Sequence, residues 1–411
     1  MPLDTMYSPK QKEVLSFSLH NDFFMLINHG AKRSGKTVVD NDIFLLELKR
    51  VSEIARSEGI KTPQYILAGA DLSSIQRNVL TELSNKYGLD IRFDKANRFS
   101  LFGVKVCCFG HSKISDLGRI RGMTAYGAYI NEATTANAQV FNEIKSRCSG
   151  TGARIIMDTN PDRPGHWLKK DYIDKADGHT IKDFHWRLTD NTFLSERYIE
   201  SIKSSTPSGV FYDRDINGAW VAASGVVYPD FSRKKHYITS DKVPYDRITK
   251  YFVGVDFGWE HAGAFVLIGK TQDGTYYLIR EWSAKHRSID KWIEIGKEIE
   301  KDFGKIYFYC DSARPDLIEA MQRARLYAVP AKKDVTAGIS AVATLFKTDK
   351  LFIVSDAVDL FDKEIDLYCW QEKSDAPVKE HDDVLDALRY GIFTEQSAAG
   401  SGHLNRVRGG I

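Results

Sequence analysis

A glycine-rich string near the N-terminus has the residue types that bind phosphate. It matches the pattern GxxxxGK[ST] at every fixed position, and we predict an ATP-binding role for Gly30, Arg33, Ser34, Gly35, Lys36 and Thr37. Glycines allow successive backbone N–H groups to curl around phosphate oxygens at the N-terminus of a helix. We therefore expect Lys36 to reach the β- and γ-phosphates of ATP and Thr37 to bind Mg²⁺.

The flanking segments have the periodicity that such a loop requires. An apolar run over residues 23–27 predicts a strand before the loop, and Val39, Ile43 and Leu46 recur at helical spacing after it. A glycine turn without a ligand is the competing interpretation, but it does not explain why a strand and a helix flank the loop. The sequence therefore predicts the P-loop of a nucleotide-binding sheet.

Hydrolysis of a nucleotide also needs a carboxylate that orients water, and this carboxylate usually ends a neighbouring strand. Residues 125–130 form a predicted strand, which Asn131 and Glu132 end. We predict that Glu132 is the catalytic base of an ATPase. Asn131 stands where an Asp commonly helps to hold Mg²⁺, so the predicted metal site has less negative charge. The alternative is that Glu132 only ends the strand.

Further apolar strands are expected at residues 65–68, 104–109 and 154–157, with helical stretches between them. This alternation predicts a mainly parallel α/β sheet whose ligand lies at the carboxyl ends of the strands. Asn160 follows the last of these strands, so it is a candidate for sensing the γ-phosphate and coupling hydrolysis to movement. An ordinary Thr-Asn-Pro turn is the plainer alternative.

Four other side chains have chemistry suited to a nucleotide site. An arginine on a γ-phosphate stabilises the transition state of phosphoryl transfer, so Arg33, Arg119 and Arg121 are candidates for an arginine finger. Each of them taken alone is more often a solvated or phosphate-contacting side chain. Gln11 follows Tyr7 in a short N-terminal pattern that can stack on an adenine and hydrogen-bond it.

The second half of the chain has a different pattern, in which acids follow apolar strands. A predicted strand precedes both Asp256 and Asp311. Asp383 and Asp386 lie three residues apart near the end of the chain, so they share one face of a predicted helix. Strand, strand and late helix is the order in which ribonuclease-H-like nucleases carry their acids.

Converging carboxylates repel one another unless divalent cations neutralise them, and oxygen ligands suit Mg²⁺ or Mn²⁺. Two such ions can activate water and stabilise the leaving oxygen when a phosphodiester is cut. We predict that Asp256 bridges both ions and that Asp311 and Asp386 each complete one. We assign Asp383 an auxiliary role in holding metal. Surface carboxylates that hold no metal are the alternative.

The ordered motifs resemble those of the large terminase subunit of tailed double-stranded DNA bacteriophages. The resemblance extends over nearly the whole chain and rests on residues 7–11, 30–37, 120–122, 130–132, 158–161, 190–191, 218–220 and 383–390, with Asp256 and Asp311. It implies an α/β fold in which a P-loop NTPase domain with a mainly parallel sheet precedes a ribonuclease-H-like α/β nuclease domain. Asn131 departs from the Asp of many relatives, and Asp383 departs from the His of some.

The resemblance also implies an activity and its partners. The ATPase would pull double-stranded DNA through the portal protein into a procapsid, and the nuclease would cut concatemeric DNA at initiation and termination. A small terminase subunit would select the DNA. A homo-oligomeric ring, expected to hold five subunits, would form on the procapsid from subunits that can be monomeric in isolation. The implied location is the host bacterial cytoplasm during virion assembly and not the mature virion.

Length and composition limit the alternatives. A chain of 411 residues with 43% hydrophobic and 27% charged residues can fill more than one core, which excludes wholesale disorder. We divide it into an ATPase domain (1–220), a linker (221–245), a nuclease domain (246–396) and a flexible tail (397–411). Five cysteines without a CxxC pair, and apolar runs too short to cross a bilayer, favour a cytoplasm and no membrane partner.

The formal net charge of +2 does not by itself indicate a nucleic-acid partner, so the DNA assignment rests on the sites. A helicase-nuclease of the repair or restriction type is one alternative, but it should carry further helicase motifs, which we do not find. A nucleotide-switched assembly subunit without turnover is the other, because Asn131 removes a charge from the predicted Mg²⁺ site.

Overall fold

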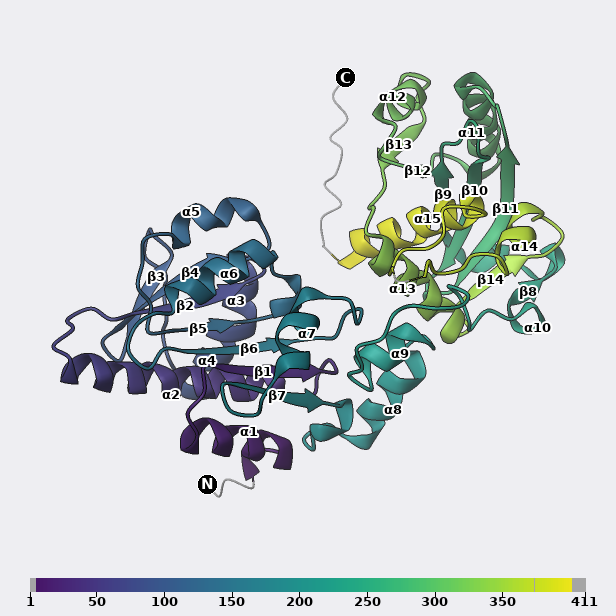
Figure 1. Cartoon of the computed structure of the whole chain (residues 1–411). Helices are drawn as coiled ribbons and strands as arrows, with labels where there is room; N and C mark the ends of the chain where they lie inside the picture. Colours follow the sequence, from purple (N-terminus) through teal and green to yellow (C-terminus); the bar gives the residue numbers. More distant parts are fainter. Residues whose placement is uncertain (1–4, 373, 401–411) are drawn as a thin grey trace. The chain divides into compact units, whose positions relative to one another are not determined.

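The computed structural model describes residues 5–372 and 374–400, which form two compact units (Figure 1). The chain passes from the first unit to the second between Ala222 and Ala223, but the earlier segment Ile202–Phe211 also belongs to the second unit. The hydroxyl of Ser208 in this segment donates to Asp230 at 2.9 Å. Sequence reasoning placed this segment in the ATPase domain because a contact so distant in sequence has no local signal.

The first unit is built on a seven-stranded sheet in the order β3-β4-β2-β5-β6-β1-β7. Its strands are β1 (Met25–Gly30), β2 (Gln64–Gly69), β3 (Arg98–Leu101), β4 (Val104–Gly110), β5 (Gly127–Ile130), β6 (Arg154–Thr159) and β7 (Ile181–Trp186). Neighbouring strands are parallel except for β3 against β4. The predicted mainly parallel sheet is confirmed, and the carboxyl ends of its parallel strands meet at one edge.

Helices cover both faces of this sheet (Figure 1). The helices that begin between residues 9 and 210 are α1 (Pro9–His20), α2 (Lys36–Ser57), α3 (Leu72–Ile75), a π-helical turn (Gln76–Leu80), α4 (Thr81–Tyr87), α5 (Leu117–Ile120), α6 (Ala138–Arg147), α7 (Trp167–Asp171), α8 (Glu196–Ser205) and α9 (Val210–Asp215). Side chains alternate across a strand, so Leu26 joins the core beneath Ile43 of α2, whereas Ile27 joins the opposite core with Phe141 of α6.

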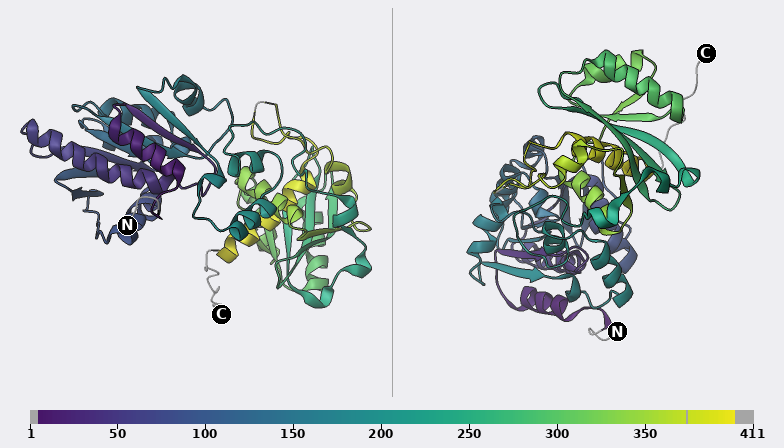
Figure 2. Two further views of the ribbon diagram at one scale, coloured as in Figure 1. Left: turned by 90° about the horizontal axis from the view of Figure 1, so that it is seen from below. Right: turned by 90° about the vertical axis from the view of Figure 1, so that its right-hand side faces the viewer.

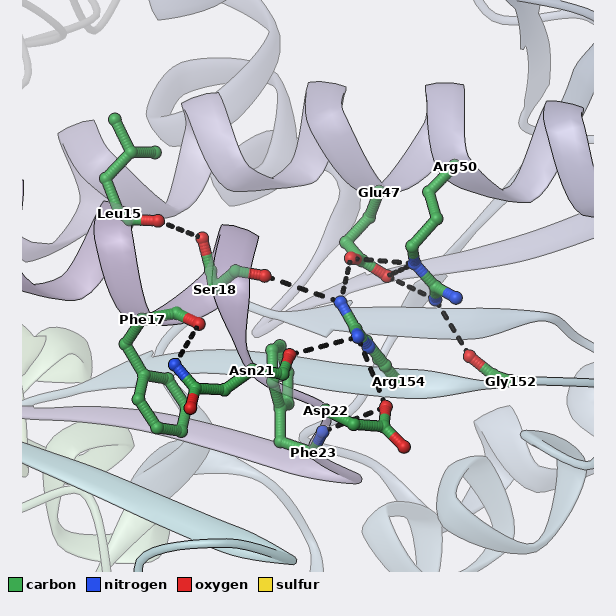
Figure 3. Close-up of polar contacts among 10 residues, drawn as sticks. All are labelled: Leu15, Phe17, Ser18, Asn21, Asp22, Phe23, Glu47, Arg50, Gly152 and Arg154. Atoms are coloured by element: carbon green, nitrogen blue, oxygen red, sulfur yellow. Dashed lines mark hydrogen bonds and ion pairs between the residues drawn. The ribbon is translucent and has the colours of Figure 1, made fainter.

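A buried ionic network ties the end of α1 to α2 and β6 (Figure 3). The guanidinium of Arg154, at the start of β6, donates to the backbone oxygens of Ser18 at 3.4 Å and Asn21 at 3.1 Å. It also donates to the carboxylate of Glu47 at 3.3 Å, which accepts from Arg50 at 2.6 Å. Glu47 is therefore the shared counter-charge of two arginines.

Replacing Glu47 with Ala should destabilise the first unit by about 2–4 kcal/mol, because the partly buried Arg50 would lose its counter-charge and Arg154 would keep only the exposed Asp22. Calorimetric unfolding of the full chain should show a lower melting temperature for the first unit only. The matched control is Glu53→Ala, an exposed glutamate on the same helix, which should change stability by less than about 0.5 kcal/mol. Equal effects of both substitutions would contradict a role for the network.

The second unit has its own seven-stranded sheet, in the order β13-β12-β9-β10-β11-β14-β8. Its strands are β8 (Tyr237–Ile238), β9 (Ile248–Asp256), β10 (Gly263–Thr271), β11 (Tyr276–Ala284), β12 (Tyr307–Cys310), β13 (Tyr327–Pro330) and β14 (Leu351–Val354). The first three long strands, β9 to β11, form an antiparallel meander, and β12 adds parallel to β9. This mixed α/β arrangement confirms the predicted second fold.

The helices of the second unit are α10 (Arg233–His236), α11 (Ile289–Phe303), α12 (Pro315–Arg323), α13 (Val335–Lys347), α14 (Leu360–Glu364) and α15 (Asp383–Gly400). Helix α15 lies against β9 and β10 (Figures 1 and 2). A Cβ atom on Gly254 of β9 would lie 1.9 Å from the backbone oxygen of Ala387, so only glycine permits this approach. The approach brings the start of α15 to the end of β9.

Helix α15 continues through residues 397–400, which the sequence analysis assigned to the flexible tail. This stretch contains no proline and ends at a glycine, so nothing in it stops the helix earlier. The rest of the predicted tail, 401–411, lies outside the described residues. Among those that are described, no helix has the length and apolar character needed to cross a membrane.

Candidate active sites

The P-loop lies between β1 and α2 and borders a cavity of about 570 Å³ at the carboxyl edge of the first sheet. Arg33 and Gly35 have φ angles of 59° and 95°, which turn the backbone sharply before α2 begins at Lys36. Thr37 is the second residue of the helix. The residues from Arg33 to Thr37 all line the cavity, as the phosphate-binding interpretation requires.

The side chain of Lys36 is held inside the P-loop by hydrogen bonds. Its Nζ atom donates to the backbone oxygens of Gly30 at 2.9 Å and Ala31 at 2.7 Å, and to Oδ1 of Asn160 at 3.2 Å. Burial lowers the pKa of this ammonium to about 8, although nearby carboxylates, Asp158 first, favour the charged form. The side chain is therefore already directed into the loop and linked to the end of β6.

Glu132 and Asn160 also line the cavity, so the structure brings these two predicted residues to the P-loop. Glu132 lies two residues after the end of β5 and has a left-handed backbone with φ of 58°. Burial, followed by the charge of Asp158, raises the pKa of the Glu132 carboxyl. A raised pKa brings a carboxylate closer to the proton affinity of a general base.

Gln11 contacts the P-loop rather than the cavity. Its Nε2 atom donates to the backbone oxygen of Gly35 at 3.0 Å, and its Oε1 atom accepts from the backbone N–H of Ser8 at 2.9 Å. Its contact with adenine stays a prediction. Arg119 and Arg121 are exposed and do not line the cavity, so neither of these two predicted fingers is brought to the P-loop within this chain.

Sequence reasoning assigned no role to several cavity residues, among them Arg77, Asn78 and Asp158. Arg77 and Asn78 lie in the π-helical turn, and such turns are frequent at functional sites because they redirect side chains. Neither residue has a local motif that marks it. Asp158 could have been found, since it is an acid near the end of a predicted strand, as Glu132 is.

The acids of the second unit gather where β9 and β12 end side by side. Asp256 is the last residue of β9, and Asp311 follows β12 with its backbone N–H donating to Val255 at 2.9 Å. The start of α15 supplies Asp383 and Asp386. Burial raises the pKa of Asp256 well above its usual value, and the charges of Asp386, Asp311 and Asp383 add to this.

Basic side chains partly balance these acids. Lys333 lies 2.7 Å from Asp311, and the buried Arg389 lies 2.8 Å from Asp386. Among the residues that the structure describes, no three His, Cys, Asp or Glu side chains are placed to hold a metal ion together. The donor chemistry nevertheless fits a divalent cation, because several carboxylates act on Asp256 and a cation would relieve their repulsion.

A further acid holds α15 in place. The buried carboxylate of Glu364 accepts from the backbone N–H groups of Asp383, Val384 and Leu385 at 3.2, 2.9 and 3.3 Å, so it caps the N-terminus of the helix. Burial and the nearby charge of Asp383 raise the pKa of Glu364 to about 8. The sequence contains no signal for this role, because the capping carboxylate lies on the preceding helix, 19 residues before Asp383.

Each of the two units matches a known protein family. Residues 29–235 match the family described as "Terminase large subunit, T4likevirus-type, N-terminal", and residues 253–395 match the "Terminase RNaseH-like domain". The chain belongs to the large terminase subunit family. It is an ATPase and a metal-dependent nuclease of phage DNA packaging, and DNA and other packaging components are its partners. These matches do not favour the two alternatives, a helicase-nuclease and a nucleotide-switched assembly subunit without turnover.

Solved structures of a large terminase are similar to this chain over nearly its whole length. The large terminase of a thermophilic bacteriophage is 26% identical, with a TM-score of 0.81 over 95% of this chain and 98% of that chain. The complexes of that protein with ADP and with ATP-γ-S give TM-scores of 0.78 and 0.77 at 26% identity, over 95% of this chain and 99% and 98% of theirs. No curated protein matches the chain.

Replacing Asp256 with Asn should have opposite effects with and without metal. The raised pKa means that ionisation of Asp256 costs stability as pH rises, so at pH 8 in EDTA the variant should melt higher by about 2–4 °C. Mn²⁺ should raise the melting temperature of the native chain more than that of the variant. The control Asp302→Asn changes an exposed acid and should alter neither result. A destabilised variant with a full Mn²⁺ response would contradict the assignment.

Proposed function

We propose that the first unit binds ATP with Mg²⁺ in the cavity beside the P-loop. Lys36 would hold the β- and γ-phosphates and Thr37 the ion, and Glu132 would accept the proton of the attacking water. The ion supplies positive charge that stabilises phosphoryl transfer. The observation that carries this proposal is the joint lining of one cavity by the P-loop, Glu132 and Asn160.

Asn160 is the proposed coupling residue of this site. Its Oδ1 atom accepts from Nζ of Lys36, so a phosphate that draws the ammonium away changes a contact with the end of β6. Arg33 and Arg77 are the arginines that line the cavity among the residues that the structure describes. The exposed Arg119 and Arg121 remain candidates for acting on a neighbouring subunit.

We also propose that the second unit uses two Mg²⁺ or Mn²⁺ ions. Asp256 would contact both, Asp311 and Asp386 would each complete one, and Asp383 would assist. Such ions supply the hydroxide and stabilise the leaving oxygen in phosphodiester cleavage. The residues of this chain bring the acids together through the paired ends of β9 and β12 and the close packing of α15.

The finer partners follow from the family and form part of the proposal. The motor would act on double-stranded DNA at the portal protein, with a small terminase subunit selecting the DNA. A homo-oligomeric ring, expected to have five subunits, would form on the procapsid, and the isolated chain can be monomeric because a docking template raises the effective concentration. The proposed location is the host bacterial cytoplasm during virion assembly.

Two substitutions in the full chain test the two sites separately. Lys36→Ala should reduce phosphate release from ATP by more than about 100-fold, since it removes the cation at the transferred phosphate. It should leave Mn²⁺-dependent nicking of supercoiled plasmid intact. Asp256→Ala should abolish nicking and leave ATP turnover within about three-fold, since it lies outside the nucleotide site.

Exposed residues of the same types provide the controls. Lys61→Ala and Asp302→Ala should behave like the native chain in both assays, because both side chains are exposed and lie outside the two sites. Persistent ATP turnover in Lys36→Ala would refute the nucleotide site. Persistent metal-dependent nicking in Asp256→Ala would refute the nuclease site.

A further inference from the structure

Asn131 directly follows β5, and Asp158 lies on the neighbouring strand β6 and lines the nucleotide cavity. Strands β5 and β6 are parallel neighbours, with Ile130 opposite Met157. The next residue along each strand is therefore Asn131 after β5 and Asp158 on β6. An amide thus stands where a carboxylate was expected, and a carboxylate stands beside it on the neighbouring strand.

Asp158 is 2% exposed, and its carboxylate accepts several hydrogen bonds. The Tyr129 hydroxyl donates at 3.0 Å, and the Asn131 amide donates to the two oxygens at 2.9 and 3.1 Å. The backbone N–H of Glu132 donates at 2.9 Å. Asp158 also lines the cavity with Thr37. This acid is therefore a fixed acceptor that borders the proposed Mg²⁺ position.

The orientation of Asn131 is set from its other side. Its Oδ1 atom accepts from the Nδ2 atom of Asn78 at 3.0 Å, so its own Nδ2 atom must face Asp158. A carboxylate at position 131 would place two like charges about 3 Å apart, and such a pair cannot both ionise without a cation between them. An amide at position 131 is therefore compatible with an ionised acid at position 158, whereas a second acid is not.

We infer that Asp158 supplies the acidic Mg²⁺ contact of the ATPase that Asn131 lacks, and that it positions Glu132 as well. The inference rests on the proposed nucleotide site. A carboxylate provides the hard oxygen that Mg²⁺ prefers, and it can act directly or through a water ligand. The acid lies on the neighbouring strand, so the charge of the site is retained.

The second part of the inference concerns the backbone of Glu132. Its left-handed conformation, with φ of 58°, is strained for a residue with a side chain. The hydrogen bond from its N–H to Asp158 compensates for this strain and fixes where the Glu132 side chain begins. Asp158 is thus a positioning residue for the proposed base.

Asp40 is the matched control, since it is another buried acid close to Lys36. It does not line the cavity, and one of its oxygens has no hydrogen-bond partner. Burial and the charge of Asp158 raise the pKa of Asp40 well above its usual value. Asp40→Asn therefore makes the same chemical change at a buried acid that does not line the cavity.

The test measures binding of mant-ATPγS to the full chain, with Mg²⁺ and with EDTA. Asp158→Asn should lose about 10- to 100-fold of the Mg²⁺-dependent affinity and keep its affinity in EDTA within about three-fold. The exchange variant N131D/D158N returns a carboxylate to the site on the other strand. It should recover most of the Mg²⁺-dependent affinity and of the ATP turnover. Asp40→Asn should match the native chain.

Asn131→Asp alone keeps the test decisive if Asp158→Asn does not fold. It should lower the melting temperature in EDTA, and Mg²⁺ with mant-ATPγS should reverse this loss. Native Mg²⁺ dependence in Asp158→Asn, no recovery in the exchange variant, or no Mg²⁺ effect on Asn131→Asp would overturn the inference. Lys36→Ala distinguishes a failure of this inference from a failure of the proposed nucleotide site, since native ATP turnover in that variant refutes the nucleotide site itself.

Discussion

Repulsion between carboxylates at the ends of neighbouring strands is the constraint on which both active sites depend. In the first unit, hydrogen-bond donors surround the carboxylate of Asp158, and Asn131 stands where a second acid would repel it. In the second unit several acids surround Asp256. The basic side chains of Lys333 and Arg389 pair with Asp311 and Asp386 rather than with Asp256. Positions 131 and 158 therefore pair an amide with an acid, whereas the acids around Asp256 retain repulsion that a metal would relieve.

Close backbone approaches are what bring these groups together. A Cβ atom on Gly30 would lie 2.0 Å from the backbone oxygen of Trp186, so glycine is required where the P-loop leaves β1 beside β7. Gly254 has the same role beneath Ala387 of α15. A larger residue at either place would displace the element that carries the candidate site residues, so both glycines affect the geometry of these sites through the packing.

Buried polar contacts also join the parts of each unit. In the first, Asn28 of β1 donates to Asp40 of α2 at 2.7 Å and accepts from the indole of Trp186 at 2.8 Å. In the second, Glu364 connects α14 to the first turn of α15. These contacts hold the strand ends and helix starts in register, and polar groups buried in this way are costly to leave without partners.

The sequence by itself determined the motifs whose signal is local. The P-loop string, Glu132 and Asp256 each lie next to an apolar run, and periodicity reveals such runs without knowledge of the fold. It placed the first strand over 23–27, whereas β1 extends to Gly30, because the buried Asn28 and His29 have partners that no local pattern shows. Only the tertiary structure placed Asp158 and Arg77 at the cavity and showed that Glu364 caps α15. Strand pairing and capping between helices depend on contacts between residues that are not close in the sequence.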